Sequence, residues 1–319
     1  MRKVVWLAAL LALGGGGRAW SADYPVRDIE MIVSFPAGGP ADASARILAP
    51  KLSQVLGVPI AVVNKTGGGG SVGADYVAKA KPDGSVVYNS TNSALTISPV
   101  LLKDVTYKIS DFTPIGAYAA DLGVITVRAG GPAKTLDELV EYAKKNPGKL
   151  TYGSAGLGTV SFFTMELFKL AYGLDITHVP FQGTGPVKNA ILGGHVTLAS
   201  SGLGSLAPLI RSGDLIPLVT TAPKRVASFP QVPTMAEKGF PEASLNIWMG
   251  VYVPARTPKP VVDALTRAFN QAAKDPAVLG ALDKAGMQGF YHTGEETARL
   301  LEQEAGTVAK VADKVGLRK

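Results

Sequence analysis

Four stretches of glycine and small hydroxyl residues recur along the chain, each between an apolar run and a helical pattern. Such turns leave backbone N–H groups unpaired at the start of a helix, where the helix dipole also favours negative charge. In an open α/β sheet they meet at the carboxyl ends of the strands, where ligands bind. The pattern predicts a site that holds a small anion by backbone amides and hydroxyls, although any single stretch could simply permit a tight turn. The stretches are FPAGGPAD (35–42), NKTGGGGS (64–71), GSAGLGT (153–159) and FQGTGP (181–186).

The second stretch also fits two other motifs. Residues 69–73 (GGSVG) match the nucleophile elbow of serine hydrolases, with Ser71 as the nucleophile. Residues 68–73 match the G-x-G-x-x-G dinucleotide fingerprint, but four residues separate them from the preceding strand, and no acidic residue ends a clear next strand. A phosphate-binding G-x-x-x-x-G-K-[ST] sequence does not occur. An exported hydrolase therefore stays open as an alternative, with its base drawn from His178, His195 and His292.

Asp42 is the acidic side chain that best fits a role at the anion site. It lies in the first turn of the helix expected after the first glycine stretch, where a carboxylate complements the dipole; contact with a ligand or a bridging water is the other interpretation. Arg46, four residues on, can pair with it. Zero cysteines and three histidines without metal-ligand spacing leave no thiolate or histidine metal site. We expect no catalytic residues, no metal and no cofactor.

Strand-like and helical patterns alternate, which predicts an α/β protein with largely parallel sheets and helices on their faces. The 319 residues fit about two domains, yet no Pro/Ser-rich linker divides them. We therefore expect two domains that share crossovers and enclose a cleft. Strands are predicted over 29–35, 60–63, 85–89, 150–153, 176–179, 196–200 and 216–220, and helices over 42–56, 71–80, 135–145, 159–172, 258–274 and 295–311.

Residues 1–21 are typical of a secretory signal peptide. Arg2 and Lys3 precede a ten-residue apolar run, and a small-x-small site ends at Ser21, where we expect cleavage. The run is too short to span a bilayer. Without this segment the net charge falls from +7 to +4, with 29 basic and 25 acidic residues, and no basic cluster indicates nucleic-acid binding. Export without cysteine favours a bacterial periplasm.

The order of the motifs resembles one family over the whole mature chain. The segments FPAGGPADASAR, VVNKTGGGGSVGADYVAKAKPDG, GSAGLGTVSFFTMELFK, HVPFQGTGPVKNAILGGHV and VPARTPKPVVDALTRAF are similar to the substrate-binding proteins of tripartite tricarboxylate transporters, the Bug family. The resemblance implies a two-lobed, Venus-flytrap-like periplasmic receptor, monomeric and without a cofactor. It would close over a small carboxylate and deliver it to a membrane permease of one large and one small subunit.

The resemblance also implies a division of the chain and a set of site residues. We expect residues 22–126 and 247–319 in lobe 1, residues 127–246 in lobe 2, and crossovers near 124–127 and 245–253. Phe162 stands where many members have a histidine, so it could suit an aromatic ligand or simply pack in the core. The expected ligand-binding residues are Phe35, Pro36, Gly38, Gly39, Asp42, Ser90, Thr91, Asn92, Ser154, Ala155, Gly156, Gly158, Thr159, Phe162, Phe181, Gln182, Gly183 and Thr184.

The ligand itself stays open among di- and tricarboxylates, acidic amino acids and aromatic carboxylates, because a head group held by backbone amides is compatible with all of them. A receptor that signals to a two-component kinase instead of a permease is a further alternative with the same fold.

Overall fold

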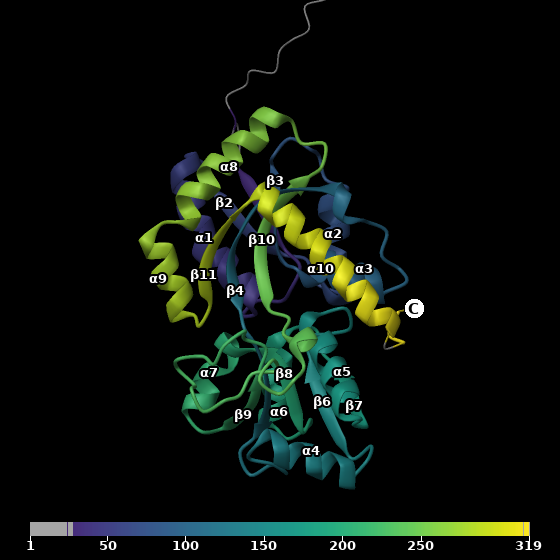
Figure 1. Ribbon diagram of the computed structural model, residues 1–319. Helices are drawn as coiled ribbons and strands as arrows, with labels where there is room; N and C mark the ends of the chain where they lie inside the picture. The colour runs from purple at the N-terminus through teal and green to yellow at the C-terminus, as the bar shows by residue number, and fades with distance from the viewer. Residues whose placement is uncertain (1–23, 25–27, 315, 319) are drawn as a thin grey trace, which may run out of the picture.

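The computed structural model describes Tyr24, residues 28–314 and residues 316–318. The predicted signal peptide, residues 1–21, lies outside them. The chain forms two units, each a β-sheet with helices on its faces, one above the other in Figure 1. We call the unit with the six-stranded sheet the first unit and the unit with the five-stranded sheet the second unit.

The first sheet has the strand order β11-β4-β10-β3-β1-β2. Strands β10 and β11 run against the other four. Side chains alternate across the sheet as the pleat requires: Ile32, Tyr88 and Tyr252 are buried on one face, and their neighbours Met31 and Val87 on the other. The strands are β1 (Ile29–Val33), β2 (Ile60–Asn64), β3 (Val86–Thr91), β4 (Phe112–Asp121), β10 (Ile247–Pro254) and β11 (Gln288–Thr293).

The second sheet has the order β7-β6-β8-β5-β9, and β5 runs against the other four strands. Both sheets are therefore mixed, which corrects the expectation of largely parallel sheets. The reversed strands β5 and β10 are each the first strand after the chain has passed from one unit to the other. The strands are β5 (Gly123–Arg128), β6 (Leu150–Ser154), β7 (Ile176–Pro180), β8 (Leu198–Gly202) and β9 (Leu215–Thr220).

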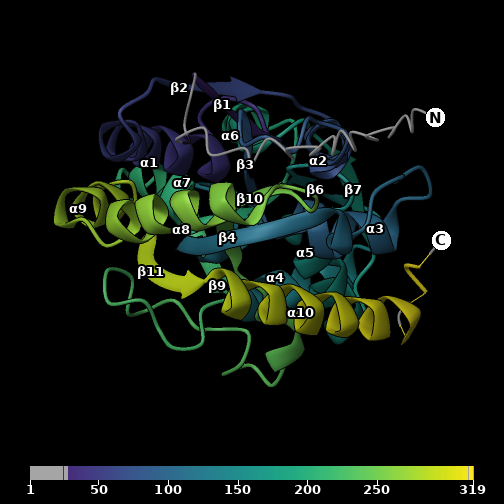
Figure 2. The same cartoon turned by 90° about the horizontal axis from the view of Figure 1, so that it is seen from above.

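Helices cover both faces of each sheet. In the first unit α1 and α8 pack on one face and α2 and α10 on the other, so that β4 lies between α8 and α10 when seen from above (Figure 2). The helices of the first unit are α1 (Pro40–Leu56), α2 (Ser71–Ala78), α3 (Ser98–Leu101), α8 (Lys259–Ala273), α9 (Pro276–Lys284) and α10 (Gly294–Lys314), and those of the second are α4 (Leu136–Lys145), α5 (Val160–Tyr172), α6 (Thr184–Leu192) and α7 (Leu203–Arg211). Short helical turns add η1 (Gly68–Gly70), η2 (Ser93–Ile97), η3 (Ile109–Asp111) and η4 (Pro241–Ala243).

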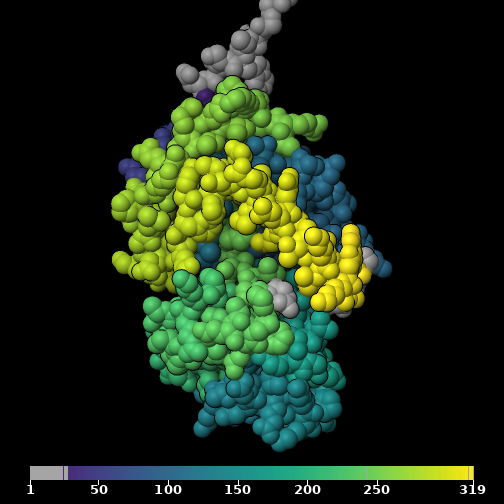
Figure 3. Space-filling model, in the orientation of Figure 1, coloured from purple at the N-terminus to yellow at the C-terminus, as the bar shows by residue number. Residues whose placement is uncertain are grey.

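The chain passes between the units at two places that lie side by side. Leu122 joins β4 to β5, and the segment 221–246 joins β9 to β10. The last residue of β4, Asp121, pairs with the first residue of β10, Ile247. We call this region the junction. The C-terminal helices return to the first unit, and α10 crosses its front and reaches toward the second (Figure 3).

Candidate functional site

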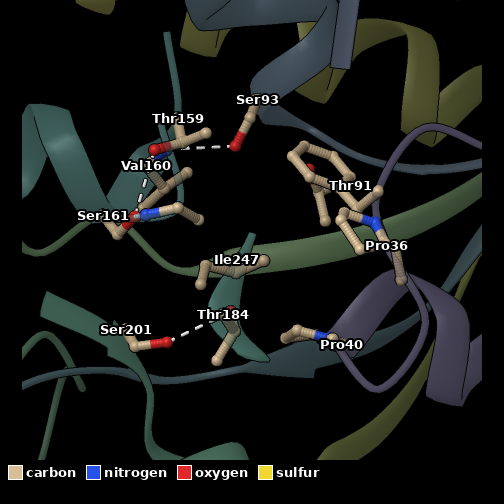
Figure 4. Close-up of a pocket in the computed structure, with 14 residues that line it drawn as sticks. Pro36, Pro40, Thr91, Ser93, Thr159, Val160, Ser161, Thr184, Ser201 and Ile247 are labelled. Carbon is tan, nitrogen blue, oxygen red and sulfur yellow. Dashed lines mark hydrogen bonds between the residues drawn. The ribbon is translucent and has the colours of Figure 1, made fainter. Parts of the chain in front are cut away.

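A pocket lies between the two units (Figure 4). Its volume is about 30 Å³, and one water needs about 10–15 Å³ on this measure. In this arrangement of the units the pocket has room for about two waters, and a dicarboxylate would need a wider gap between them. The wall consists of Phe35, Pro36, Gly39, Pro40, Ala41, Thr91, Ser93, Ala155, Thr159, Val160, Ser161, Thr184, Ser201 and Ile247.

Three helices begin at this wall. Pro40 and Ala41 open α1 in the first unit, Val160 and Ser161 open α5 in the second, and Thr184 opens α6. Within the described chain, α1 and α6 have no side-chain cap; glycine stands at both N-cap positions. Helix N-termini that lack a cap offer N–H groups and a positive dipole end to an anion. Two units thus present such ends to one small space.

The remaining polar groups of the wall are hydroxyls. Thr91 Oγ1 is buried and has no hydrogen-bond partner among the described residues. Ser201 Oγ donates to Thr184 Oγ1 at 3.2 Å, and Thr159 Oγ1 lies 3.0 Å from Ser161 Oγ. None of the lining residues carries a charge. The wall can therefore bind an anion by hydrogen bonds without a counter-ion.

Hydrogen bonds and backbone contacts hold the units closed around the pocket. Val160 N donates to Ser93 Oγ at 3.0 Å across the gap. Ser98 Oγ lies 3.0 Å from the Gly158 carbonyl oxygen of the second unit and 3.0 Å from that of Gly69 in its own unit. Gly69 packs against the backbone of residues 157–158, in the third glycine stretch, which belongs to the second unit. Its φ is +61°, so a side chain there would be strained and would also clash with that backbone. The glycine loop 67–70 therefore forms the rim of the closed cleft and does not line the pocket.

Asp42 lies behind the wall and organises the first loop. Its carboxylate accepts hydrogen bonds from Gly38 N at 3.0 Å, Asn64 Nδ2 at 3.0 Å and Arg46 Nε at 3.0 Å. Burial raises the pKa of Asp42, but the bonds from Arg46, Gly38 and Asn64 outweigh it and lower the pKa. The carboxylate is thus ionised and fully engaged, which favours the structural interpretation of this residue over ligand contact.

Two other predicted residues also face away from the pocket. Asn92 Nδ2 donates to the Asn246 carbonyl at 3.0 Å and to Glu304 Oε1 at 2.7 Å. Ser90 Oγ donates to Ser34 Oγ at 3.3 Å inside the first unit. Both side chains are fully buried, so their amide and hydroxyl groups hold elements together.

In the second unit, Ser154 and Phe162 contact a half-buried histidine. Ser154 Oγ lies 2.8 Å from His178 Nε2, and the His178 ring lies between Tyr152 and Phe162, with ring centroids 4.7 and 4.8 Å away. Burial lowers the pKa of His178 to about 4, so it is neutral at pH 7. Phe162 is therefore a core residue beneath the N-terminus of α5, and a role in aromatic recognition receives no support.

Of the eighteen predicted residues, the pocket wall contains seven, namely Phe35, Pro36, Gly39, Thr91, Ala155, Thr159 and Thr184. Of the rest, Gly183 contacts the first unit, since a Cβ there would lie 2.8 Å from Pro36 Cδ. The ligand-binding role of all eighteen stays a prediction. The residues outside the wall are Gly38, Asp42, Ser90, Asn92, Ser154, Gly156, Gly158, Phe162, Phe181, Gln182 and Gly183.

Sequence reasoning missed seven wall residues. Four are the first residues of the helices that follow predicted site residues, and Ser93 follows the predicted run 90–92. Extending each predicted segment by two residues at its C-terminal end would have included all five. Ser201 and Ile247 come from the end of one strand and the start of another, and no local signal marks them. The missed residues are Pro40, Ala41, Ser93, Val160, Ser161, Ser201 and Ile247.

Ser71 does not stand in a nucleophile elbow. It opens α2 seven residues after β2 ends, and none of its described hydrogen bonds joins it to a histidine. The serine that does contact a histidine, Ser154, is fully buried. Among the residues that the structure describes, no cluster of acidic and histidine side chains could hold a metal ion. No described helix combines the length and apolarity needed to cross a membrane.

Similar proteins agree with this architecture. BugT of Bordetella pertussis is 33% identical over 99% of this chain and 98% of its own length. The structure of the periplasmic binding protein BugD, 34% identical, covers 93% of this chain and all of its own, with a TM-score of 0.87. Two further structures are 29% identical: Rhodopseudomonas palustris MatC with bound malate (TM-score 0.85; 90% of this chain, 99% of that one) and an R. palustris protein with adipate (TM-score 0.87; 92% and 99%).

Residues 44–317 match the family described as tripartite tricarboxylate transporter family receptor, TctC. The match confirms the resemblance seen in the sequence, and the structural similarity confirms a two-unit α/β fold of the periplasmic binding protein type. The chain belongs to the tripartite tricarboxylate transporter receptors, a family of periplasmic solute-binding proteins.

Proposed function

We propose that this protein binds a small carboxylate between its two units and delivers it to a membrane permease of the tripartite type. The observation that carries the proposal is the convergence of three helix N-termini from both units, together with buried hydroxyls, on a pocket whose wall has no charge. A carboxylate fits that set of donors. Relatives with bound malate and adipate support the same class of ligand.

A linear dicarboxylate fits the arrangement best. One carboxylate would lie at the start of α1 in the first unit and the other at α5 and α6 in the second, with Phe35 and Ile247 beside the carbon chain. Backbone donors are fixed before binding, so little side-chain entropy is lost. The ligand would bridge the units in an arrangement wider than the present one, and it would stabilise that arrangement against further opening.

The units would act as lobes that open and close about the junction. We place the lobe boundaries at Leu122 and within the segment 221–246, because β5 belongs wholly to the second sheet and β10 to the first. Closure would bring Ser93 to Val160 and Ser98 to Gly158, and it would create the surface that the permease reads. Export by the predicted signal peptide, with cleavage near Ser21, would place a monomeric receptor in the periplasm.

We propose binding without catalysis. A serine hydrolase needs an exposed nucleophile within hydrogen-bond reach of its base. Ser71 has no such contact with a histidine among the described residues, and in the Ser154–His178 pair the serine is fully buried. The charge-free wall also contains no group suited to acid–base work.

The test is thermal unfolding of the mature protein after bound ligand has been removed by denaturation and refolding. Malate, adipate, citrate, benzoate and acetate would be compared with succinamide, which has the shape of a dicarboxylate without its charge. A ligand at 100 times its dissociation constant adds about 2.7 kcal/mol of stability, or about 4 °C for a chain of this length. We expect one dicarboxylate to shift the midpoint and succinamide to leave it unchanged. Folded protein that no carboxylate stabilises would contradict the proposal.

A further inference from the structure

A single carboxylate on the C-terminal helix holds three donors behind the first unit's pocket wall. Glu304 Oε1 accepts hydrogen bonds from Asn92 Nδ2 at 2.7 Å and Thr96 Oγ1 at 2.6 Å, and Oε2 accepts one from Trp248 Nε1 at 2.8 Å. Asn92 and Thr96 are fully buried and Trp248 nearly so. Glu304 lies 212 residues after Asn92 in the sequence. The helix that crosses the front of the molecule therefore ties together the turn after β3 and the strand β10.

The residues that Glu304 holds are the direct neighbours of pocket residues. Asn92 stands between Thr91 and Ser93, both of which line the pocket, and Trp248 follows Ile247, which lines it too. Asn92 Oδ1 also accepts a hydrogen bond from Trp248 N at 3.2 Å. A change in the orientation of Asn92 would therefore displace wall residues from two separate segments.

The same network continues to the junction. Asn92 Nδ2 donates to the Asn246 carbonyl, and Asn246 Oδ1 accepts a bond from Thr221 Oγ1 at 3.0 Å. Gly123 N in turn donates to Thr221 Oγ1 at 2.7 Å. Gly123 begins β5, and Thr221 and Asn246 bound the other passage. Hydrogen bonds thus connect Glu304 to both places where the chain passes between the units.

We propose that Glu304 is a positioning residue for ligand binding, which fixes Asn92 and Trp248 so that the first unit's wall and the junction keep one geometry. The inference rests on the proposed function. Glutamine in place of Glu304 would keep one acceptor oxygen but put an NH₂ group where the other oxygen was, so at least one of the three donors would lose its acceptor, and a buried donor without a partner is costly. The wall would then relax before any ligand contact is lost, since Glu304 itself does not line the pocket.

The experiment compares the Glu304→Gln variant with Glu302→Gln. Glu302 is exposed on the same helix, so its variant makes the same change of charge outside the network. With malate and adipate as probes, we expect E304Q to raise the dissociation constant about tenfold or more and E302Q to change it less than twofold. Leu301→Val, a core change on α10, controls for loss of stability: it should lower the unfolding midpoint without weakening binding. E304Q within twofold of the wild type, or an L301V loss of affinity as large as that of E304Q, would overturn the inference.

A measurement without ligand separates this inference from the proposed function. We expect the backbone amide NMR signals of Thr91, Ser93 and Ile247 to move in E304Q and to stay in place in E302Q. A wild type that binds neither probe would count against the proposed function, and the amide signals would still decide the positioning role. Unmoved signals in E304Q would overturn it.

Discussion

The two units build their halves of the pocket wall by different means. In the first unit, carboxyl groups hold the wall from elements distant in the sequence: Asp42 receives bonds from Arg46 and Asn64, and Glu304 holds Asn92 behind the turn after β3. Asn64 lies 22 residues from Asp42, and Asn92 lies 212 residues from Glu304, whereas Arg46 is only four residues from Asp42. The first half of the wall depends on the whole unit being folded.

In the second unit, hydroxyls hold the wall within one loop. Thr159 Oγ1 donates to the Gly156 carbonyl at 2.6 Å and accepts from Phe162 N at 3.3 Å. Ser161 Oγ accepts from Ala155 N at 3.2 Å. These bonds span three to six residues, and a further wall bond of this unit, from Ser201 to Thr184, spans 17. Substitutions behind the first unit's wall should therefore lower both the stability of the fold and the affinity for ligand. Those in the second unit's wall should have local and smaller effects.

The largest expected effect lies at the junction, at Asp121, which pairs with the wall residue Ile247. Asp121 Oδ1 accepts a hydrogen bond from Gly204 N at 2.9 Å, while Oδ2 is buried without a partner among the described residues. Burial raises the pKa of Asp121 to about 7, against the lowering effect of the Gly204 and Ser205 amides. Because the folded pKa lies above the unfolded one, the stabilisation is complete below about pH 4 and is lost as the pH rises through 7.

The Asp121→Asn variant removes this titration. The free energy of unfolding of the wild type should fall by about 2–3 kcal/mol relative to D121N between pH 5 and pH 8. Urea unfolding of both proteins across this range checks it, and His178 contributes equally to both. Curves that stay parallel at all pH values would show that Asp121 does not titrate there.

The next effect concerns the charged anchor of the first wall. Asp42→Asn should cost about 2 kcal/mol of stability, because the amide cannot accept all the bonds that the carboxylate takes, and it should also weaken ligand binding. Asp75→Asn is the matched control: Asp75 lies at the surface with the exposed Lys79 and Thr106 as its partners, and the amide can still accept from Thr106, so the loss of the ion pair should cost less than about 0.5 kcal/mol. Urea unfolding measures both losses. If the two variants lost equal free energy of unfolding, Asp42 would not be a special anchor of the first unit's wall.

A smaller change tests the contact between the units. Gly183 has a φ of +100°, and a Cβ there would lie 2.8 Å from Pro36 Cδ in the first unit. Gly183→Ala should weaken carboxylate binding about tenfold, or about 1.4 kcal/mol, because strain and the clash oppose closure. In Gly185→Ala the new methyl meets no atom within 4 Å, so calorimetry should find its affinity close to that of the wild type. An unchanged affinity in G183A would mean that closure does not depend on this contact.

The smallest expected effect is in the second wall. Thr159→Ala should cost about 1 kcal/mol of stability, since it removes the N-cap of α5. Thr159→Ser keeps the oxygen and should restore most of the loss in a thermal unfolding series. If the serine variant were as unstable as the alanine variant, packing of the methyl group and not the cap would explain the cost.

Local patterns in the sequence predicted most helices and the strands that carry regular turn signals. The helix predicted over 135–145 is confirmed as α4, and Thr135 is its N-cap, with Glu138 N donating to Thr135 Oγ1 at 3.2 Å. Strand β10 was expected to contain a crossover; all eight of its residues are buried, so no alternation of polar and apolar residues marks it. Strand β4 was missed because Pro114 and Gly116 weaken the strand pattern.

The site was predicted where it depends on short segments and missed where it depends on distant ones. The first, third and fourth glycine stretches predicted where α1, α5 and α6 begin at the pocket. By contrast, Asn92 has the residue type and position of a ligand contact, but its partners Asn246 and Glu304 lie 154 and 212 residues away. Spacing in the sequence cannot report such partners, because only the folded sheet brings them together.

In the proposed complex, helix N-termini of both units hold one carboxylate ligand. The direct measurement is a titration of the ¹⁵N-labelled, ligand-free protein with the dicarboxylate that stabilises it most, followed through the backbone amide signals. We predict that the signals of Ala41, Ser161 and Thr184 move together and saturate with one dissociation constant. Signals that move in only one unit, or only outside the pocket, would contradict the account.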